Sequence, residues 1–338
     1  MLNDFPAAVD GYKLAIQAAP SCVEAMVNLG VLHNKLNQPH EAIKAFQLAL
    51  AKKPQLLAAH LNLGITYFRT ARYDLAKEAL QNTLKLDPQH AQARQLLALT
   101  LIAREEFKEA AGELEQLTKL TPDANTFTAL GETYLRLKRY PDAVTAFEKA
   151  VQLESASAKT HLRLAEALDN AGQTDTAIAE LQRATQLDPA LPEAHYALGH
   201  VFLKRNRIDE ALSEFQKELQ QNPGMLLARY EAGKIYYQRD RIDEAVSELS
   251  KVVEADQTFR PAIETLAQAR LKQGSFNEAI ALLERVVALD PTWPNAFALL
   301  GRAYTRAGRR EDAKKAFATA QRLSAEERKR LEDAVSKP

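Results

Sequence analysis

Cysteine is almost absent from this chain of 338 residues, which contains only Cys22. A single cysteine cannot form a disulfide within the chain, so no internal disulfide framework is expected. The scarcity fits a reducing compartment, and we expect a cytoplasmic protein. Export, for instance to the periplasm, stays open, because many exported bacterial proteins also lack cysteine.

An excess of charge of either sign is also lacking. The chain has 44 basic and 44 acidic side chains and a pI near 7.1. Proteins that bind nucleic acids usually have a strong basic excess, so we expect no nucleic-acid partner. The longest apolar runs are too short to span a bilayer, so we expect no membrane insertion.

Glycine is scarce, at 12 residues, and β-branched runs bounded by turn residues are missing. Alanine and leucine are abundant instead. This composition is typical of an all-α fold.

Proline marks an internal repeat. Pro20, Pro54, Pro88 and Pro122 are each 34 residues apart, and the series resumes at Pro189. The interval from Pro122 to Pro189 is 67 residues, one short of two repeats, and the missing residue falls at Asp123. A fixed period of this length indicates stacked supersecondary units.

Small residues recur at two positions of each repeat. A Leu-Gly or Leu-Ala pair comes first, and an alanine follows twelve residues after its small member. We expect each repeat to be a helical hairpin in which the two small residues face each other, for instance Gly233 and Ala245. A bulky residue four positions after the alanine would fill the gap to the neighbouring hairpin. Proline then ends the second helix. The alanines are Ala42, Ala76, Ala110, Ala143, Ala177, Ala211, Ala245, Ala279 and Ala313.

In its 34-residue period and its Leu-Gly, Tyr, Ala, Phe, Ala and Pro positions, the chain closely resembles the tetratricopeptide-repeat family. The resemblance runs from the start of the chain to about residue 324. It implies a right-handed superhelical solenoid of antiparallel helix hairpins, whose first helices line a concave groove that binds extended peptides or helices. We expect a half-repeat consisting of a second helix only over 1–22, nine hairpins over 23–324, and a capping helix and tail over 325–338 that begins at an N-cap, Ser324.

Catalytic motifs are missing. Gly233-Lys234 lacks the other residues of a phosphate loop and falls in the small-residue position of a hairpin. His60, His161 and His195 share one repeat position, which indicates packing rather than zinc binding. We therefore expect no enzyme activity, no cofactor and no metal site. A substrate-selecting or regulatory arm of an enzyme whose catalytic domain lies outside this chain stays open as an alternative.

Two zones stand out on the groove side of the first helices. Repeats are numbered here with the half-repeat as the first. The apolar zone, in the second to fourth repeats, could bind an apolar helix, although its side chains could instead pack against the next hairpin. The residues that we assign to it as partner-binding are Leu61, Phe68 and Ile102. The tyrosine–basic zone, in the seventh to tenth repeats, suits an acidic segment or a C-terminal carboxylate, unless it is simply a solvated face. Its residues are Tyr196, Lys204, Tyr230, Lys234, Tyr237, Lys272, Arg302 and Arg306.

Adjacent tyrosines show how one first helix would divide its faces. We expect Tyr236 to point into the stack, like Tyr67, Tyr134 and Tyr304 at the same repeat position, and Tyr237 to lie in the groove. The function predicted from the sequence is a non-enzymatic protein-interaction scaffold. A further alternative is self-association as a homodimer through the open edge of the N-terminal half-repeat.

Overall fold

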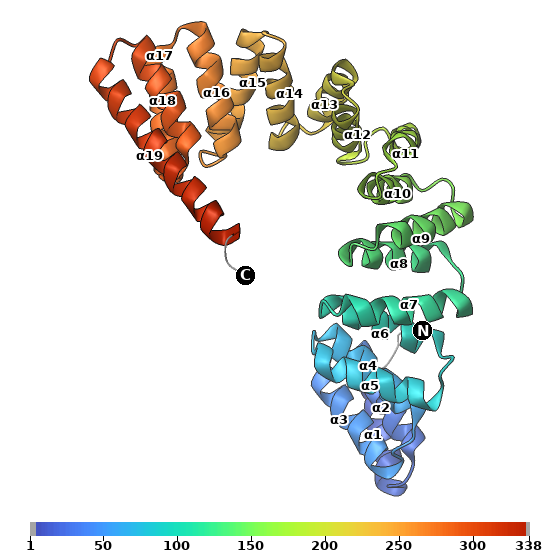
Figure 1. The fold of residues 1–338 in the computed structure, drawn as a ribbon. Helices are drawn as coiled ribbons and strands as arrows, with labels where there is room; N and C mark the ends of the chain where they lie inside the picture. Colours follow the sequence, from blue (N-terminus) through green and yellow to red (C-terminus); the bar gives the residue numbers. More distant parts are fainter. Residues whose placement is uncertain (1–4, 336–338) are drawn as a thin grey trace. The chain divides into compact units, whose positions relative to one another are not determined.

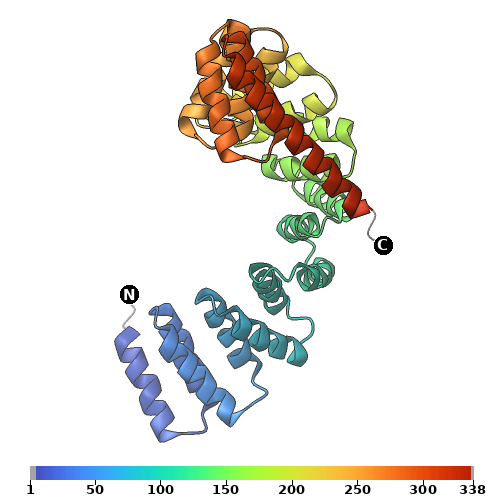
Figure 2. The ribbon, with the colours of Figure 1, turned by 60° about the vertical axis from the view of Figure 1, so that its left-hand side comes forward.

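The fold is a series of antiparallel helix pairs, as the sequence predicts. The computed structural model describes residues 5–335, apart from the side chains at 331 and 333–335. Within that range it contains nineteen helices and no strand (Figure 1). Within each of the two compact units, a second helix packs on the first helix of its own hairpin and on that of the hairpin that follows. Figure 2 shows these pairs following one another in chain order within each unit.

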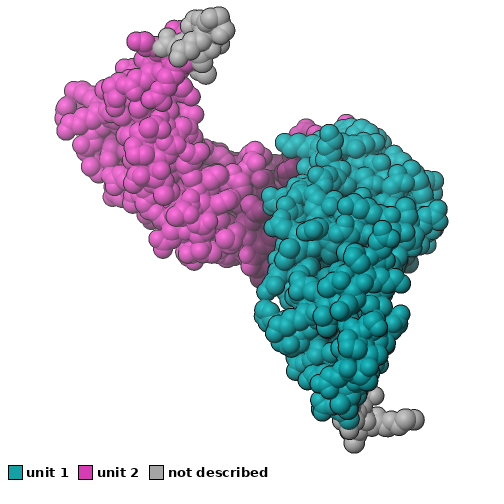
Figure 3. Space-filling model, turned by 90° about the horizontal axis from the view of Figure 1, so that it is seen from below, with its two compact units in different colours: residues 1–187 teal, residues 188–338 magenta. Residues whose placement is uncertain are grey.

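The chain divides into two compact units, residues 1–187 and 188–338 (Figure 3). In the first unit, α1 precedes five hairpins: α1 (Phe5–Ala18), α2 (Val23–Lys35), α3 (Pro39–Lys52), α4 (Leu57–Arg69), α5 (Tyr73–Leu86), α6 (Ala91–Ala103), α7 (Phe107–Leu120), α8 (Ala124–Arg136), α9 (Tyr140–Leu153), α10 (Ala158–Asn170) and α11 (Thr174–Leu187). The second unit holds four hairpins: α12 (Ala194–Lys204), α13 (Ile208–Gln221), α14 (Leu226–Gln238), α15 (Ile242–Ala255), α16 (Arg260–Gln273), α17 (Phe276–Leu289), α18 (Pro294–Arg306) and α19 (Arg310–Val335).

The small residue of each first helix faces the bulky residue of its partner helix. A β-carbon built at Gly233 would lie 2.8 Å from Cγ of Leu249, and one built at Gly30 would lie 2.4 Å from the ring of Phe46. The expectation that the bulky residue fills the gap to the neighbouring hairpin is therefore wrong. In the hairpin of Gly199, the equivalent of Gly233, a β-carbon would also lie 3.1 Å from the carbonyl oxygen of Ala211, the equivalent of Ala245. The bulky side chain fills the space left by the glycine inside its own hairpin, and Ala245 is buried one turn away.

The turn inside each hairpin uses one left-handed residue at a constant repeat position. Three of these residues are glycines, with φ of 78° to 83° at Gly172, Gly274 and Gly308. The other six carry side chains and have φ of 54° to 60°. Left-handed backbone costs a residue with a side chain about 1–2 kcal/mol. These six residues are Asn37, Ala71, Glu105, Lys138, Asn206 and Asp240.

The inward tyrosines lie where the repeat predicts them. Tyr67, Tyr134, Tyr236 and Tyr304 are all buried. Their hydroxyls reach the second helix of the preceding hairpin: that of Tyr134 donates to Glu115 at 2.7 Å, and that of Tyr236 accepts from the Gln216 amide at 2.7 Å. Each contact thus joins two consecutive hairpins.

The C-terminal helix differs from the expectation. The helix α19 runs without a break from Arg310 to Val335, so the prediction of a separate capping helix after Ser324 is wrong. The residues around Ser324 are good helix formers, and no glycine or proline interrupts them. The serine and the glutamate three residues later therefore lie inside a helix instead of starting one. Residues 1–4 and 336–338 of the two expected end segments lie outside the described residues.

Candidate functional site

All eight residues of the tyrosine–basic zone lie on first helices of the second unit. Tyr196 and Lys204 are on α12, and Lys272 is on α16. The tyrosines and Lys234 are half-buried, whereas Lys204, Lys272 and the two arginines are exposed. The remaining members are Tyr230, Lys234 and Tyr237 on α14, and Arg302 and Arg306 on α18.

Two of the tyrosines are each paired with a lysine. The ammonium nitrogen of Lys234 lies 5.7 Å from the ring centroid of Tyr230 on the same helix. The ammonium nitrogen of Lys272 lies 4.7 Å from the ring centroid of Tyr237, so this pair joins α14 to α16. Cations over aromatic faces are attracted by the ring quadrupole. The structure therefore brings together Tyr237 and Lys272, which are 35 residues apart in sequence.

Both lysines also have acidic partners. Lys234 lies 3.1 Å from the carboxylate of Glu231, and Lys272 lies 2.8 Å from that of Asp240. The Asp240 carboxylate raises the pKa of Lys272 above its usual range. Part of the positive charge that the sequence places on this face is thus already compensated. In contrast, Arg302 and Arg306 form no ion pair with any residue in the described range.

Tyr230 is held by an aromatic residue that the sequence analysis missed. Its ring meets that of Phe259, at the start of α16, edge to face at a centroid distance of 5.2 Å. Burial raises the pKa of the Tyr230 hydroxyl, so the phenol is neutral at physiological pH. The only signal for this contact in the sequence is an aromatic residue before Arg260-Pro261.

Tyr196 makes contacts within its own hairpin. Its ring lies 5.8 Å from that of Phe215 and 6.3 Å from that of His200. Its backbone N–H donates to Glu218, a carboxylate that is only 1% exposed, at 3.3 Å. Tyr196 therefore contributes to the hairpin core as well as to the surface.

The apolar zone in the first unit is partly used for stacking. Phe68 packs against the cluster around Leu63 and Tyr67, and Leu61 and Ile102 pack against the cluster around Leu97. All three predicted residues are half-buried. Each therefore has only part of its surface available to a partner.

Ile102 also lines a pocket between α6, α8 and α10, with a volume of 490 Å³. Its wall combines apolar and charged side chains, including Ala129 and Arg163. Arg163 lies 2.9 Å from Glu166, and the guanidinium of Arg136 stacks on Phe107 at 4.9 Å from its centroid. The sequence analysis did not assign Arg136 or Phe107 to a site, because their contact depends on the stacking of two hairpins.

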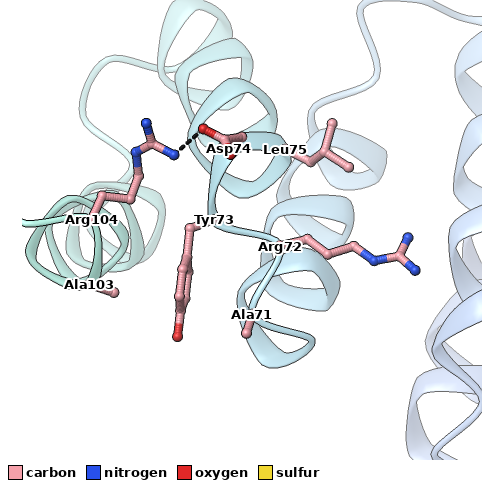
Figure 4. Close-up of a pocket in the computed structure, with 7 residues that line it drawn as sticks. All are labelled: Ala71, Arg72, Tyr73, Asp74, Leu75, Ala103 and Arg104. Carbon is pink, nitrogen blue, oxygen red and sulfur yellow. Dashed lines mark hydrogen bonds and ion pairs between the residues drawn. The ribbon is translucent and has the colours of Figure 1, made fainter.

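A second pocket of 490 Å³ lies where the turn inside one hairpin meets the turn inside the next, away from the predicted residues (Figure 4). Tyr73 projects into the space between Ala71 and Ala103, and Arg104 forms an ion pair with Asp74. The same bridge recurs between Arg239 and Asp209, at 2.8 Å. Such bridges tie the start of a second helix to the end of the following first helix, which indicates a structural role for this pocket's charged wall.

Two of the three histidines at the shared repeat position, His161 and His195, are buried packing residues, whereas His60 is half-buried. Nδ1 of His161 lies 2.6 Å from Glu180, and Nδ1 of His195 lies 2.6 Å from Glu214. Each pair ties the two helices of one hairpin together. Within the described range, no group of three or more His, Cys, Asp or Glu side chains could hold a metal ion.

Comparison with known families gives matches along the whole chain. The sequence model of the cilia and flagella-associated protein 70 C-terminal domain, a tetratricopeptide-repeat domain, matches residues 2–191. The general tetratricopeptide-repeat model matches 170–217, 202–269 and 270–336. This chain belongs to the tetratricopeptide-repeat family. Members of the family are protein-interaction scaffolds, so the fold supports a scaffold role in general. The repeats of this family are typically non-catalytic.

The chain is similar to several solved structures, among them YrrB and MamA. YrrB, whose structure is described as that of a TPR protein with an unusual peptide-binding site, is 21% identical with a TM-score of 0.50; the match covers 55% of this chain and 96% of YrrB. MamA from Desulfovibrio magneticus RS-1 is 21% identical with a TM-score of 0.46, covering 50% of this chain and 96% of MamA. No curated protein matches the chain. Among the helices described, none is both long and apolar enough to cross a bilayer.

Proposed function

We propose that this protein is a non-enzymatic scaffold that binds a peptide or helix of a partner protein on the first helices of its second unit. The observation that supports this most is the pair of half-exposed rings on α14, Tyr230 and Tyr237, each with a lysine nitrogen over it. Tyrosine combines a large apolar area with a hydroxyl, and it is enriched among residues that dominate binding energy. YrrB, which shares the fold, is described as having a peptide-binding site.

The charges on this face suggest how a partner would be oriented. Lys234 and Lys272 are each bound to a carboxylate of the protein, so an acidic partner would have to compete with Glu231 and Asp240. Arg302 and Arg306 on α18 have no such competitor within the described residues. An apolar or aromatic side chain would therefore pack on α14, and a carboxylate would bind at α18.

The experiment is selection from a displayed peptide library with matched variants. The wild type should enrich peptides in which an apolar or aromatic residue is accompanied by an acidic residue or a free C-terminus. The double variant Tyr230→Ala/Tyr237→Ala should lose this enrichment, while Arg302→Glu/Arg306→Glu should keep the apolar preference and lose the acidic one. Tyr140→Ala, which removes a half-buried tyrosine at the start of a second helix, serves as the control. Equal enrichment by the wild type and the double tyrosine variant would reject the proposal.

The apolar zone of the first unit would bind a second segment of a partner, an apolar helix. The support for this is the pocket beside Ile102, whose wall includes Ala129 and Leu135. All three predicted residues are half-buried, but Ile102 is the one that lines this pocket, so we expect it to contribute more than Leu61 and Phe68.

A further inference from the structure

Glu264, on α16, is the only charged residue at its repeat position in the nine hairpins. In the two preceding hairpins the position holds Tyr196 and Tyr230, two members of the tyrosine–basic zone. In the other six hairpins it holds uncharged residues: Val27, Leu61, Gln95, Thr128, Leu162 and Ala298. Glu264 therefore places a carboxylate on the side of the first helices that carries the two tyrosines.

The carboxylate of Glu264 is half-buried. The Gln268 side-chain amide donates a hydrogen bond to it at 3.2 Å. Burial raises the pKa of this carboxyl above its usual range, because desolvation disfavours the charged form, and the charge of Arg260 offsets only part of this effect. Burial also raises the pKa of the Tyr230 hydroxyl, and the charges of Glu231 and Glu264 raise it further. The carboxylate of Glu264 thus lies beside the ring of Tyr230.

The basic side chains around Glu264 are bound to other carboxylates. Arg260, one turn earlier on α16, lies 2.6 Å from the carboxylate of Asp290. Lys234 and Lys272 have the acidic partners described above. No ion pair reaches Glu264 in the part of the chain that the structure describes. The protein therefore leaves one partly desolvated negative charge on this face without a positive partner.

We propose that the partner segment presents a lysine or arginine side chain to Glu264, between its apolar or aromatic residue on α14 and its carboxylate at α18. This inference rests on the proposed function and specifies the chemistry of the segment. In the second unit, α16 lies between α14 and α18 and contacts both helices (Figure 1). The groups of the partner therefore follow the order apolar or aromatic, basic, acidic.

A basic side chain suits this position better than a neutral donor. Burial removes part of the hydration of the carboxylate, and an ammonium or guanidinium group replaces it with both a charge and N–H donors. Such charge-assisted hydrogen bonds are roughly twice as strong as neutral ones. The ring of Tyr230 beside the carboxylate also offers apolar surface to the aliphatic stem of a lysine or arginine.

The first test adds three variants to the selection from a displayed peptide library. The wild type should enrich a basic residue between the apolar or aromatic residue and the acidic residue or free C-terminus. Glu264→Gln keeps the size of the side chain and should lose only the basic preference, whereas Glu264→Lys should replace it with an acidic one. The control Glu254→Gln removes the same charge from an exposed position on α15 and should select the same peptides as the wild type.

The second test is a double-mutant cycle with one enriched peptide, measured by isothermal titration calorimetry. Glu264→Gln should bind the peptide at least about tenfold more weakly than the wild type does. A version of the peptide with methionine in place of its basic residue should bind both proteins within about twofold. Because Glu264→Gln removes a partly desolvated charge that has no positive partner, it should unfold in urea no earlier than the wild type.

The outcomes separate this inference from the proposed function. Enrichment of apolar and acidic residues without a basic one would overturn the inference and leave the proposed function standing. A library from which the wild type enriches no peptide would overturn both. Equal affinity of the wild type and Glu264→Gln for the basic peptide, or an equal loss in the control Glu254→Gln, would overturn the role of Glu264.

Discussion

The ring of Phe147 lies directly against the backbone of Gly131. A β-carbon built on this glycine would be 2.8 Å from three ring atoms, closer than carbon atoms can pack. Phe147 is 0% exposed, so its ring has no room to withdraw. The close approach of the two helices in this hairpin therefore depends on glycine.

Gly131→Ala should lower the stability by about 1–3 kcal/mol, the usual cost of overpacking a core. Gly112→Ala is the matched control, because it adds the same methyl group on the exposed side of α7, where nothing lies within 4 Å. This control should raise the stability by about 0.5–1 kcal/mol, since alanine is the better helix former. Urea unfolding of both variants measures the difference, and equal effects would contradict the packing described.

A second prediction concerns the hairpin turn at Lys138, whose φ is 58°. Lys138→Gly should stabilise the protein by up to about 1 kcal/mol, because relief of the left-handed backbone outweighs the extra entropy of glycine in the unfolded chain. Lys138→Ala removes the same charge without relieving the backbone, so it should give no gain. Thermal unfolding of the two variants side by side decides the matter. A higher midpoint for the alanine variant than for the glycine variant would refute the explanation.

Much of this fold could be predicted from the sequence, because the 34-residue period places similar residues at the same position of nine hairpins. The inward position of Tyr236 followed directly from Tyr67, Tyr134 and Tyr304 at the same repeat position, and it is confirmed. The recognition role of Tyr237 remains a prediction. A period shows which residues are equivalent, but it does not show which residue faces which. That is why the bulky residue, here Leu249, was expected to fill the gap to the neighbouring hairpin, whereas it packs on Gly233 of its own hairpin.

Contacts between neighbouring hairpins could not be predicted from the sequence, for a related reason. The stacking of Lys272 on Tyr237 and of Phe259 on Tyr230 depends on the rotation from one hairpin to the next. The uninterrupted helix at Ser324 was missed because a serine followed by a glutamate three residues later occurs inside helices as well as at their starts. Sequence spacing alone cannot separate these two cases.

A third prediction concerns the ion pair inside the seventh hairpin. Arg229 lies 2.5 Å from Glu248 and also donates to the carbonyl of Pro223 at 2.7 Å, and both charged side chains are at most 20% exposed. Glu248→Ala should cost about 1–3 kcal/mol, because it leaves the guanidinium partly buried without its carboxylate. Glu311→Ala removes one partner of an exposed pair with Lys314 and should have no measurable effect. The two variants can be compared by urea unfolding, and similar losses would show that burial does not matter here.

The last prediction concerns pH. Burial, followed by the hydrogen bond that Tyr304 donates to Glu284 at 2.8 Å, raises the pKa of this phenol to about 12. An unperturbed tyrosine has a pKa of about 10. The neutral form is therefore favoured in the folded state, so its contribution to stability is complete below about pH 10 and is lost as the pH rises towards 12.

Tyr304→Phe should be less stable than the wild type by about 1 kcal/mol at neutral pH, through loss of the hydrogen bond. The gap between the two proteins should shrink above about pH 10, when the wild type begins to lose its advantage. Urea unfolding across this pH range tests the point, and a gap that stays constant to pH 12 would contradict the raised pKa.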